Sequence, residues 1–320
     1  MTIKNYAKYF IQRVLGTYWI LFRVIFPTMI IIKIATEYGV IDKAAELMSP
    51  VLSMIGLPGE AAIVWATAIF TNLFVAVAVF SQLVSPESWT LAQVSVIGLM
   101  MLFAHELPLE CTVARLTGLP IWYSLILRLG TALGTGFLVM YLLSSFNIYQ
   151  GAFTVPFEVS ANIDNQSLSD WTISLLRTLG TIFLIVAGMT LVLDVIKFSG
   201  FDRFISRLLS PILRSIGSTP AAADMTIIGL TLGLSYGAGM MIQEAKDSTM
   251  SPQDRTSVMS FISLSHSLIE DTLVVAFMGG ALSILLGARL FFTLLIALSF
   301  RFFSVYSWIS NMRSAQVQNY

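Results

Sequence analysis

The stretch Phe103-Ala-His-Glu-Leu-Pro-Leu-Glu110 returns later in the chain, in modified form, as Leu264-Ser-His-Ser-Leu-Ile-Glu-Asp271. The two copies lie 161 residues apart (266 minus 105), and they contain the two histidines of the chain, His105 and His266. Other residues match at the same offset without a gap: Gly39 and Gly200, Ser49-Pro50 and Ser210-Pro211, Ile55-Gly56 and Ile216-Gly217, Gln82 and Gln243, Gly118 and Gly279, Arg128 and Arg289. One ancestral unit has therefore been doubled.

The composition is that of a membrane protein. Hydrophobic residues make up 56% of the chain and charged residues 11%, against about 25% charged in a typical soluble domain. Apolar stretches near the ~20 residues that span a bilayer recur along the chain: 14–36, 60–84, 91–117, 121–144, 171–198, 221–243, 257–286 and 288–310. The sequence predicts an all-α polytopic membrane protein with four stretches in each half. Zero net charge and the lack of a basic block argue against a nucleic acid partner.

The distribution of Lys and Arg predicts the orientation. Basic residues occur in 4–13 and again in 197–214, whereas 146–170 contains none, so we expect the first two segments inside and the third outside. Each half then crosses the membrane an odd number of times, and one of its four stretches is re-entrant. We expect a first repeat at 1–145 with a cytoplasmic N-terminus, an extracytoplasmic loop at 146–170, and a second, inverted repeat at 171–320, in the inner or plasma membrane with both termini cytoplasmic.

The second stretch of each repeat is the expected re-entrant hairpin. Gly229–Gly239 contains four glycines, and each costs about 1 kcal/mol relative to alanine inside a continuous helix. Its counterpart in the first repeat is the polar pair Thr71-Asn72. Irregular backbone at membrane depth is tolerated where it is buried in protein or lines a cavity. Each repeat is therefore predicted to have three transmembrane helices and one hairpin.

An amphipathic segment lies between the first and second stretches of each repeat. Residues 201–216 place apolar residues on one face and arginines toward the other, which is typical of a helix in the membrane interface. The matching segment 41–55 contains Lys43 and Glu46. We interpret both as interfacial connectors.

The third stretch of each repeat carries the candidate site, because ionisable residues inside a membrane are costly and functional by default. Pro108 should break the first of these helices just before itself. His266 and Glu270 are four apart and would share one face of an intact helix. The candidate binding residues of the two repeats are Asn72, Gln82, His105, Glu106 and Glu110, then Ser235, Tyr236, Gln243, Glu244, His266, Glu270 and Asp271.

Basic residues near these stretches have a supporting role in this interpretation. Arg128 and Arg289 are expected to orient or pair with charged groups near helix ends, and Arg23 and Lys33 to extend toward the interface by default. A membrane histidine can also serve only as a polar contact between helices. We favour a functional cavity here because both repeats have a histidine beside acids at the same register.

Two further phrases mark the second repeat: residues 233–239 read Gly-Leu-Ser-Tyr-Gly-Ala-Gly, and residues 265–271 read Ser-His-Ser-Leu-Ile-Glu-Asp.

 These phrases, together with the hairpin and the broken polar helix, resemble membrane proteins of the nucleoside-recognition (Gate) domain family, over roughly residues 20–310. That family is similar in core to concentrative nucleoside transporters and to the membrane domain of ferrous-iron transporters. The resemblance implies that hairpin tips and broken helices form the site. Cys111 follows Glu110 and does not match the hairpin cysteine of the iron transporters, so the resemblance does not name the cargo.

Two classes of function follow. The first is a secondary transporter of a small polar solute of nucleoside type, with a divalent metal as the alternative cargo, since imidazoles and carboxylates are metal ligands. The second is a non-transporting sensor or subunit in which the polar cluster only fixes packing. An enzyme is disfavoured, because residues 105–110 lack the second histidine of the His-Glu-x-x-His zinc motif. No cofactor is expected; the coupling ion, H+ or Na+, and the oligomeric state stay open.

Overall fold

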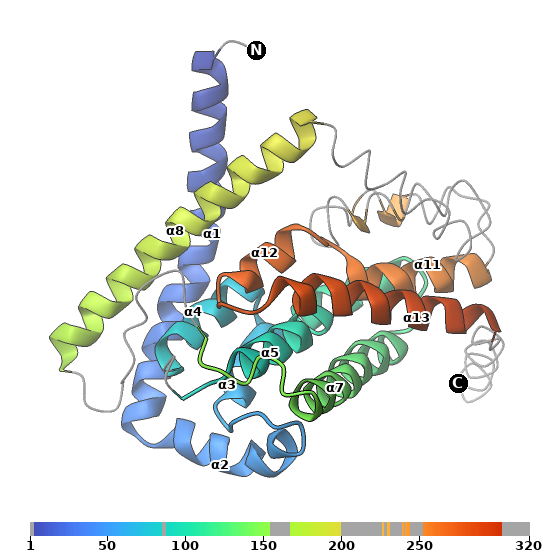
Figure 1. Cartoon of the computed structure of the whole chain (residues 1–320). Helices are drawn as coiled ribbons and strands as arrows, with labels where there is room; N and C mark the ends of the chain where they lie inside the picture. Colours follow the sequence, from blue (N-terminus) through green and yellow to red (C-terminus); the bar gives the residue numbers. More distant parts are fainter. Residues whose placement is uncertain are drawn as a thin grey trace, which may run out of the picture. The chain divides into compact units, whose positions relative to one another are not determined.

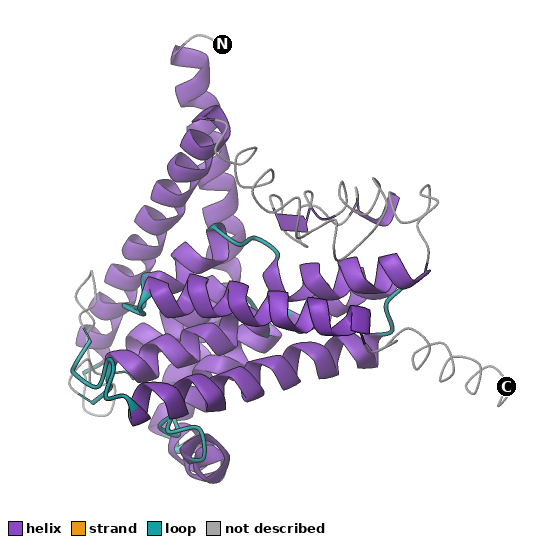
Figure 2. Cartoon of the chain, turned by 45° about the vertical axis from the view of Figure 1, so that its right-hand side comes forward, coloured by secondary structure: helices purple, strands orange, loops and turns teal. Residues whose placement is uncertain are grey.

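The computed structural model describes residues 3–84, 88–153, 167–199 and 252–302, with positions 226, 229–230, 239 and 241–243 between them. No strand occurs in these residues (Figure 2), which confirms the all-α prediction. The elements of the first half are α1 (Ile3–Glu37), α2 (Val40–Ser53), α3 (Ala61–Phe70), α4 (Leu73–Leu83), α5 (Leu91–Phe103), α6 (Leu107–Leu116) and α7 (Ile121–Ser145). Those of the second half are α8 (Leu168–Ser199), α11 (Pro252–Ser265), α12 (Glu270–Ala276), the π-helix η1 (Ser283–Ala288) and α13 (Arg289–Phe302) (Figure 1).

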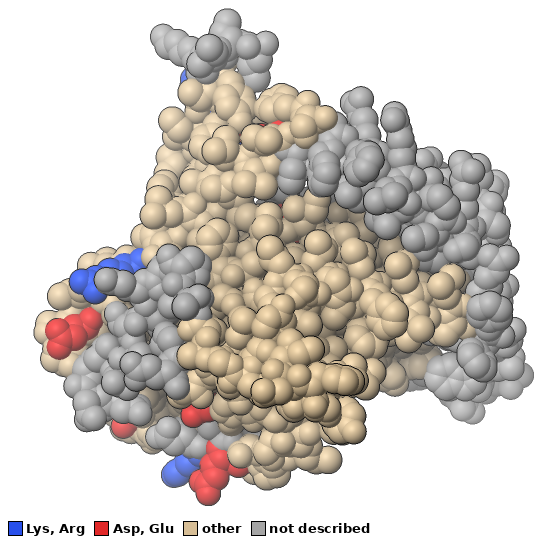
Figure 3. All heavy atoms as spheres, viewed as in Figure 1, with Lys and Arg blue, Asp and Glu red and all other residues tan. Residues whose placement is uncertain are grey.

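Among the described residues, five helical segments are long and apolar enough to cross a membrane, which confirms a multi-pass membrane protein. They are Asn5–Glu37, Leu91–Leu116, Ile121–Ser145, Leu168–Val192 and Arg255–Ala276. The face drawn in Figure 3 agrees, since nearly all of its described atoms belong to residues that are neither acidic nor basic. A face with so few charged residues suits contact with lipid, where a charged side chain is costly.

The sequence repeat is visible in the helix boundaries. Adding 161 to the bounds of α5 gives 252–264, and α11 spans Pro252–Ser265. The same shift takes α6 to 268–277, where α12 spans Glu270–Ala276, and α1 to 164–198, where α8 spans Leu168–Ser199. The doubling therefore extends from sequence to structure.

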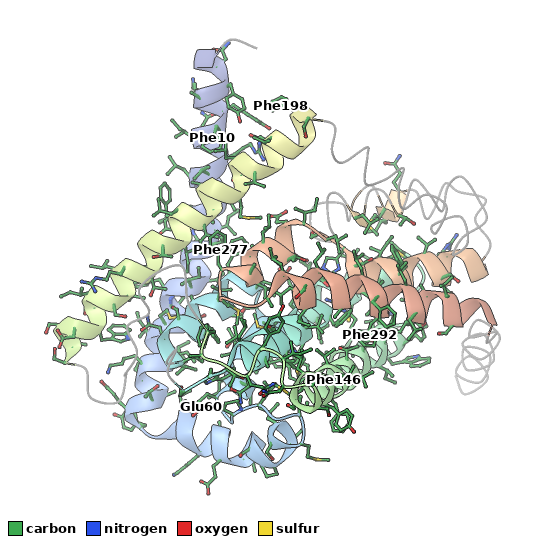
Figure 4. The ribbon with its side chains drawn as sticks, in the orientation of Figure 1. Phe10, Glu60, Phe146, Phe198, Phe277 and Phe292 are labelled. Carbon is green, nitrogen blue, oxygen red and sulfur yellow. The ribbon has the colours of Figure 1, made fainter. Side chains whose placement is uncertain are left out.

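The chain forms two compact units. Unit 1 consists of Met1–Glu106, Ala132–Ser199 and Ile269–Leu285. In it α1 lies beside α8 (Figures 1 and 2), α4 packs against both, and α12 packs against α4, α5 and α8. The ring of Tyr6 lies between those of Phe10 on α1 and Phe198 on α8, both labelled in Figure 4, with ring centroids 6.2 and 6.0 Å away.

Unit 2 consists of Leu107–Thr131, Gly200–Leu268 and Leu286–Tyr320. Its described helices are α6, the first part of α7, α11 and α13; α11 lies along α13 and also packs against α6. The two repeats are therefore interleaved. α6 comes from the first repeat and packs with α11 of the second, whereas α12 of the second repeat packs with α4 and α5 of the first.

The predicted irregularity at Asn72 is confirmed, because α3 ends at Phe70 and α4 begins at Leu73. Asn72 caps α4, and its side-chain oxygen accepts a hydrogen bond from the Val75 amide at 3.0 Å. α3 and α4 also pack against each other. A return to the same membrane face stays a prediction, and most of the glycine-rich counterpart, 231–238, lies outside the described residues.

One of the two predicted amphipathic segments is described. The segment predicted at 41–55 forms α2, where Lys43 and Glu46 are exposed. Its counterpart at 201–216 lies outside the described residues.

Candidate functional site

Both third stretches are interrupted at the histidine. α5 ends at Phe103 and α6 begins at Leu107, so the break predicted from Pro108 is confirmed. In the second repeat α11 ends at Ser265 and α12 begins at Glu270. The helix is therefore not intact between His266 and Glu270, and the shared face expected for an intact helix does not form.

The backbone has the same conformation at the two breaks. Glu106 has a φ of 47° and Ser267 a φ of 44°, in the left-handed region that non-glycine residues rarely adopt. The Glu106 amide donates to the Ala68 carbonyl at 2.8 Å, and the Ser267 amide donates to the Gly229 carbonyl at 3.4 Å. All four residues match at the 161-residue offset. Strain of this kind, about 1–3 kcal/mol per residue, persists where surrounding structure enforces it and points to function.

In unit 2 the Glu110 carboxylate lies between two basic side chains. Arg128 on α7 pairs through Nη1 with Oε2, and His266 Nε2 lies 2.9 Å from Oε1. Glu110, Arg128 and His266 are at most 2% exposed. A buried carboxylate is stable only when it is paired and hydrogen-bonded, so this cluster satisfies Glu110 at both oxygens.

Arg289, at the start of α13, binds the backbone of the second break. Its Nε donates to the Leu264 carbonyl at 3.2 Å and its Nη2 to the His266 carbonyl at 2.9 Å. These are carbonyls whose helical partners are lost where α11 ends. The prediction that Arg128 and Arg289 pair with or orient groups near helix ends is confirmed. Of the two other basic residues, Lys33 is buried and pairs with Glu37 at 3.3 Å, while Arg23 is exposed and stacks on Trp19.

In unit 1 the corresponding histidine faces the corresponding acid. His105 Nε2 lies 3.6 Å from Asp271 Oδ2. His105 and Asp271 are the repeat partners of His266 and Glu110. Each histidine therefore faces the acid of the other repeat, which is a reciprocal arrangement.

Both imidazole rings are oriented in the same way. His105 Nδ1 lies 2.9 Å from the Met101 carbonyl oxygen, and His266 Nδ1 lies 3.2 Å from the Ile262 carbonyl oxygen. Each contact is with the residue four positions earlier. In both repeats the backbone therefore binds Nδ1 and leaves Nε2 directed toward the acid.

The other predicted residues have different positions. Gln82 is buried, and its amide donates to Ser174 Oγ at 3.1 Å and Thr178 Oγ1 at 2.9 Å, so it ties α4 to α8. Glu106 and Glu270 are half-buried at the two breaks, and Gln243 is exposed. Ser235, Tyr236 and Glu244 lie outside the described residues. The prediction that both histidine–acid pairs line one shared site stays a prediction.

The sequence interpretation overlooked one buried charge pair. Asp194 on α8 is 5% exposed, and it accepts hydrogen bonds from Arg13 at 2.7 Å and from the Tyr6 hydroxyl at 2.9 Å. The signal was available, because an acid inside the apolar stretch 171–198 needs a partner. The pair joins α1 to α8.

Comparisons with known proteins agree with the resemblance stated above. The model of the Gate family, described as nucleoside recognition, matches residues 18–147. The chain is also similar to the uncharacterized membrane protein YvoD of Bacillus subtilis (strain 168), with 29% identity over 265 residues that cover 81% of this chain and 82% of that protein. No solved structure matches the chain. The match to the Gate family confirms the resemblance in the first repeat.

Proposed function

We propose that this Gate-containing membrane protein is a transporter that binds a small polar solute of nucleoside type at the broken helices of its two repeats. The observation that carries the proposal is the repeat-equivalent break at His105 and His266, each with a buried histidine facing an acid. Discontinuous helices whose ends hold polar groups are the usual substrate and ion sites of secondary transporters. The family description, nucleoside recognition, supports the class of solute.

The reciprocal pairing supports a two-fold relation between the repeats. Two copies related by a two-fold axis make each cross-copy contact twice, with the roles of the copies exchanged, and the two histidine–acid pairs have this pattern. Combined with an odd number of crossings per repeat, that axis lies in the membrane plane and the repeats are inverted. Both termini are then cytoplasmic, and 146–170 is the outer loop.

The acids divide into two roles in this proposal. Glu110 is bound by Arg128 and His266, so it maintains the architecture of the break. Glu270 and Asp271 begin α12 and are half-buried, and we assign them to the hydroxyl groups of the solute. Carboxylates are acceptors that fit the paired hydroxyls of a ribose.

Binding measurements on the purified protein in lipid nanodiscs test the proposal. Nucleosides and, separately, Mn²⁺ and Zn²⁺ are titrated by calorimetry into the wild type, Glu270→Gln and Asp271→Asn. We expect nucleoside binding that weakens at least tenfold in both variants, while thermal unfolding stays unchanged. The matched control is Glu46→Gln, an exposed acid on α2, which should bind like the wild type.

Each other outcome has a definite meaning. Binding of a metal but of no nucleoside would replace the solute with the alternative cargo. If the wild type binds no ligand and the two variants lose stability, the non-transporting alternative is favoured, in which the acids only fix packing.

A further inference from the structure

The polar contacts of the His266 ring show how many protons the ring and Glu110 must hold between them. A backbone carbonyl oxygen only accepts hydrogen bonds, so the contact of Nδ1 with Ile262 places a proton on Nδ1. The other ring nitrogen, Nε2, lies 2.9 Å from a carboxylate oxygen of Glu110. A carboxylate also only accepts, so that second contact needs one proton more than neutral histidine and ionised glutamate contain.

The charge next to this contact is also fixed by the structure. Within unit 2, Arg128 pairs with the other oxygen of Glu110, and Arg289 binds the His266 carbonyl, so two described arginines, from α7 and α13, lie next to the pair. Arginine does not lose its proton in proteins. The two arginines therefore keep their protons, and His266 and Glu110 are the groups of this described contact that can gain or lose one.

We infer that Nε2 of His266 and Oε1 of Glu110 bind one exchangeable proton, and that this proton is the coupling ion of the transporter. The coupling role rests on the proposed function, whereas the proton site does not. Without the proton, lone pairs of Nε2 and Oε1 face each other at 2.9 Å, and the contact becomes repulsive. Because Glu110 is on α6 and His266 directly follows α11, proton binding controls a link between the two repeats.

The reciprocal pair in unit 1 provides an internal comparison. His105 Nδ1 is bound to the Met101 carbonyl, so Nε2 again faces an acid, but the distance to Asp271 is 3.6 Å. That separation is too long for a hydrogen bond. The inferred proton site is therefore the contact of His266 with Glu110, and the inference does not extend to His105 and Asp271.

Nitrogen NMR of the imidazole tests the proton site without any solute. In a ¹⁵N-histidine-labelled His105→Gln protein, the remaining histidine signal belongs to His266, because the chain has two histidines. The signal reports whether one or both ring nitrogens carry a proton as the pH is varied from 5 to 8. We expect the proton affinity of His266 to fall at least tenfold when Glu110→Gln and Arg128→Gln are added together.

The double substitution is chosen because Glu110→Gln alone leaves Arg128 buried and uncompensated, and such a variant can fail to fold. Removing both charges leaves the net charge of the cluster unchanged. Glu46→Gln is the control and should leave the His266 signal unchanged. An unchanged proton affinity in the folded double variant would overturn the inference, even if solute binding is found.

Coupling is then measured on the full chain in proteoliposomes. We expect an imposed pH gradient to drive nucleoside uptake in the wild type, and to fail to drive it in the folded double variant. Uptake that is equally gradient-driven in both would overturn the coupling role. A positive proton measurement together with no solute binding would refute the transporter and leave the proton site standing.

Discussion

At the scale of single residues, Arg128 is the group on which the buried cluster depends. Its guanidinium is fully buried and pairs with one oxygen of Glu110, while His266 contacts the other. The sequence predicted that His105, Glu110, His266 and Asp271 belong together, because each has a partner at the same offset. It did not predict that each acid would face the histidine of the other repeat, since an offset relates copies and does not say which copies touch.

Replacing Arg128 by Gln should destabilise the protein by about 3–5 kcal/mol, because it leaves the buried Glu110 carboxylate without its cation. Adding Glu110→Gln to this variant should restore much of the loss. Equilibrium unfolding in mild detergent measures the two single variants and the double variant as a cycle. Arg115→Gln, an exposed arginine on α6, is the control. Equal stability of Arg128→Gln and of the double variant would contradict the ion-pair assignment.

At the scale of elements, the two helix breaks arise from the fold as much as from the local sequence. Pro108 predicted the first break, whereas the second has no proline between Ser265 and Glu270 and still has the same left-handed residue and amide contact. A positive φ at Ser267 has no sequence signal, because serine does not favour that conformation. The packing of α6 and α12 against helices of the other repeat could not be predicted either. An apolar pattern shows that a helix is buried, but it does not identify the helices that it contacts.

Pro108→Ala should therefore keep the break and change the free energy of unfolding by less than about 1 kcal/mol. The physical reason is that the bond from Glu106 to Ala68 holds the first break as the bond from Ser267 to Gly229 holds the second. Unfolding measurements and a structure of the variant check this. A continuous helix through residues 104–106 would show that the proline alone makes the break.

At the scale of the whole molecule, the number of membrane crossings per repeat decides between inverted and parallel repeats. The segment 146–170 has no Lys or Arg, whereas 4–13 and 197–214 are basic. Reporter fusions after Asn165 and at Tyr320 should therefore report opposite sides of the membrane. The same side for both fusions would refute the inverted arrangement. A fusion at Met1 is the control and should agree with the one at Tyr320.

The pairing of Glu110 with Arg128 also has a consequence for biosynthesis. On the ribosome, Arg128 is added 18 residues after Glu110, whereas His266 is added 156 residues after it (266 minus 110). Protein synthesis adds roughly 5–20 residues per second, so Glu110 is part of the nascent chain for on the order of ten seconds before His266 is added. During that interval Arg128 is the counter-ion that lets the helix with Glu110 remain in the bilayer. The second repeat is then inserted beside a carboxylate whose charge Arg128 already balances.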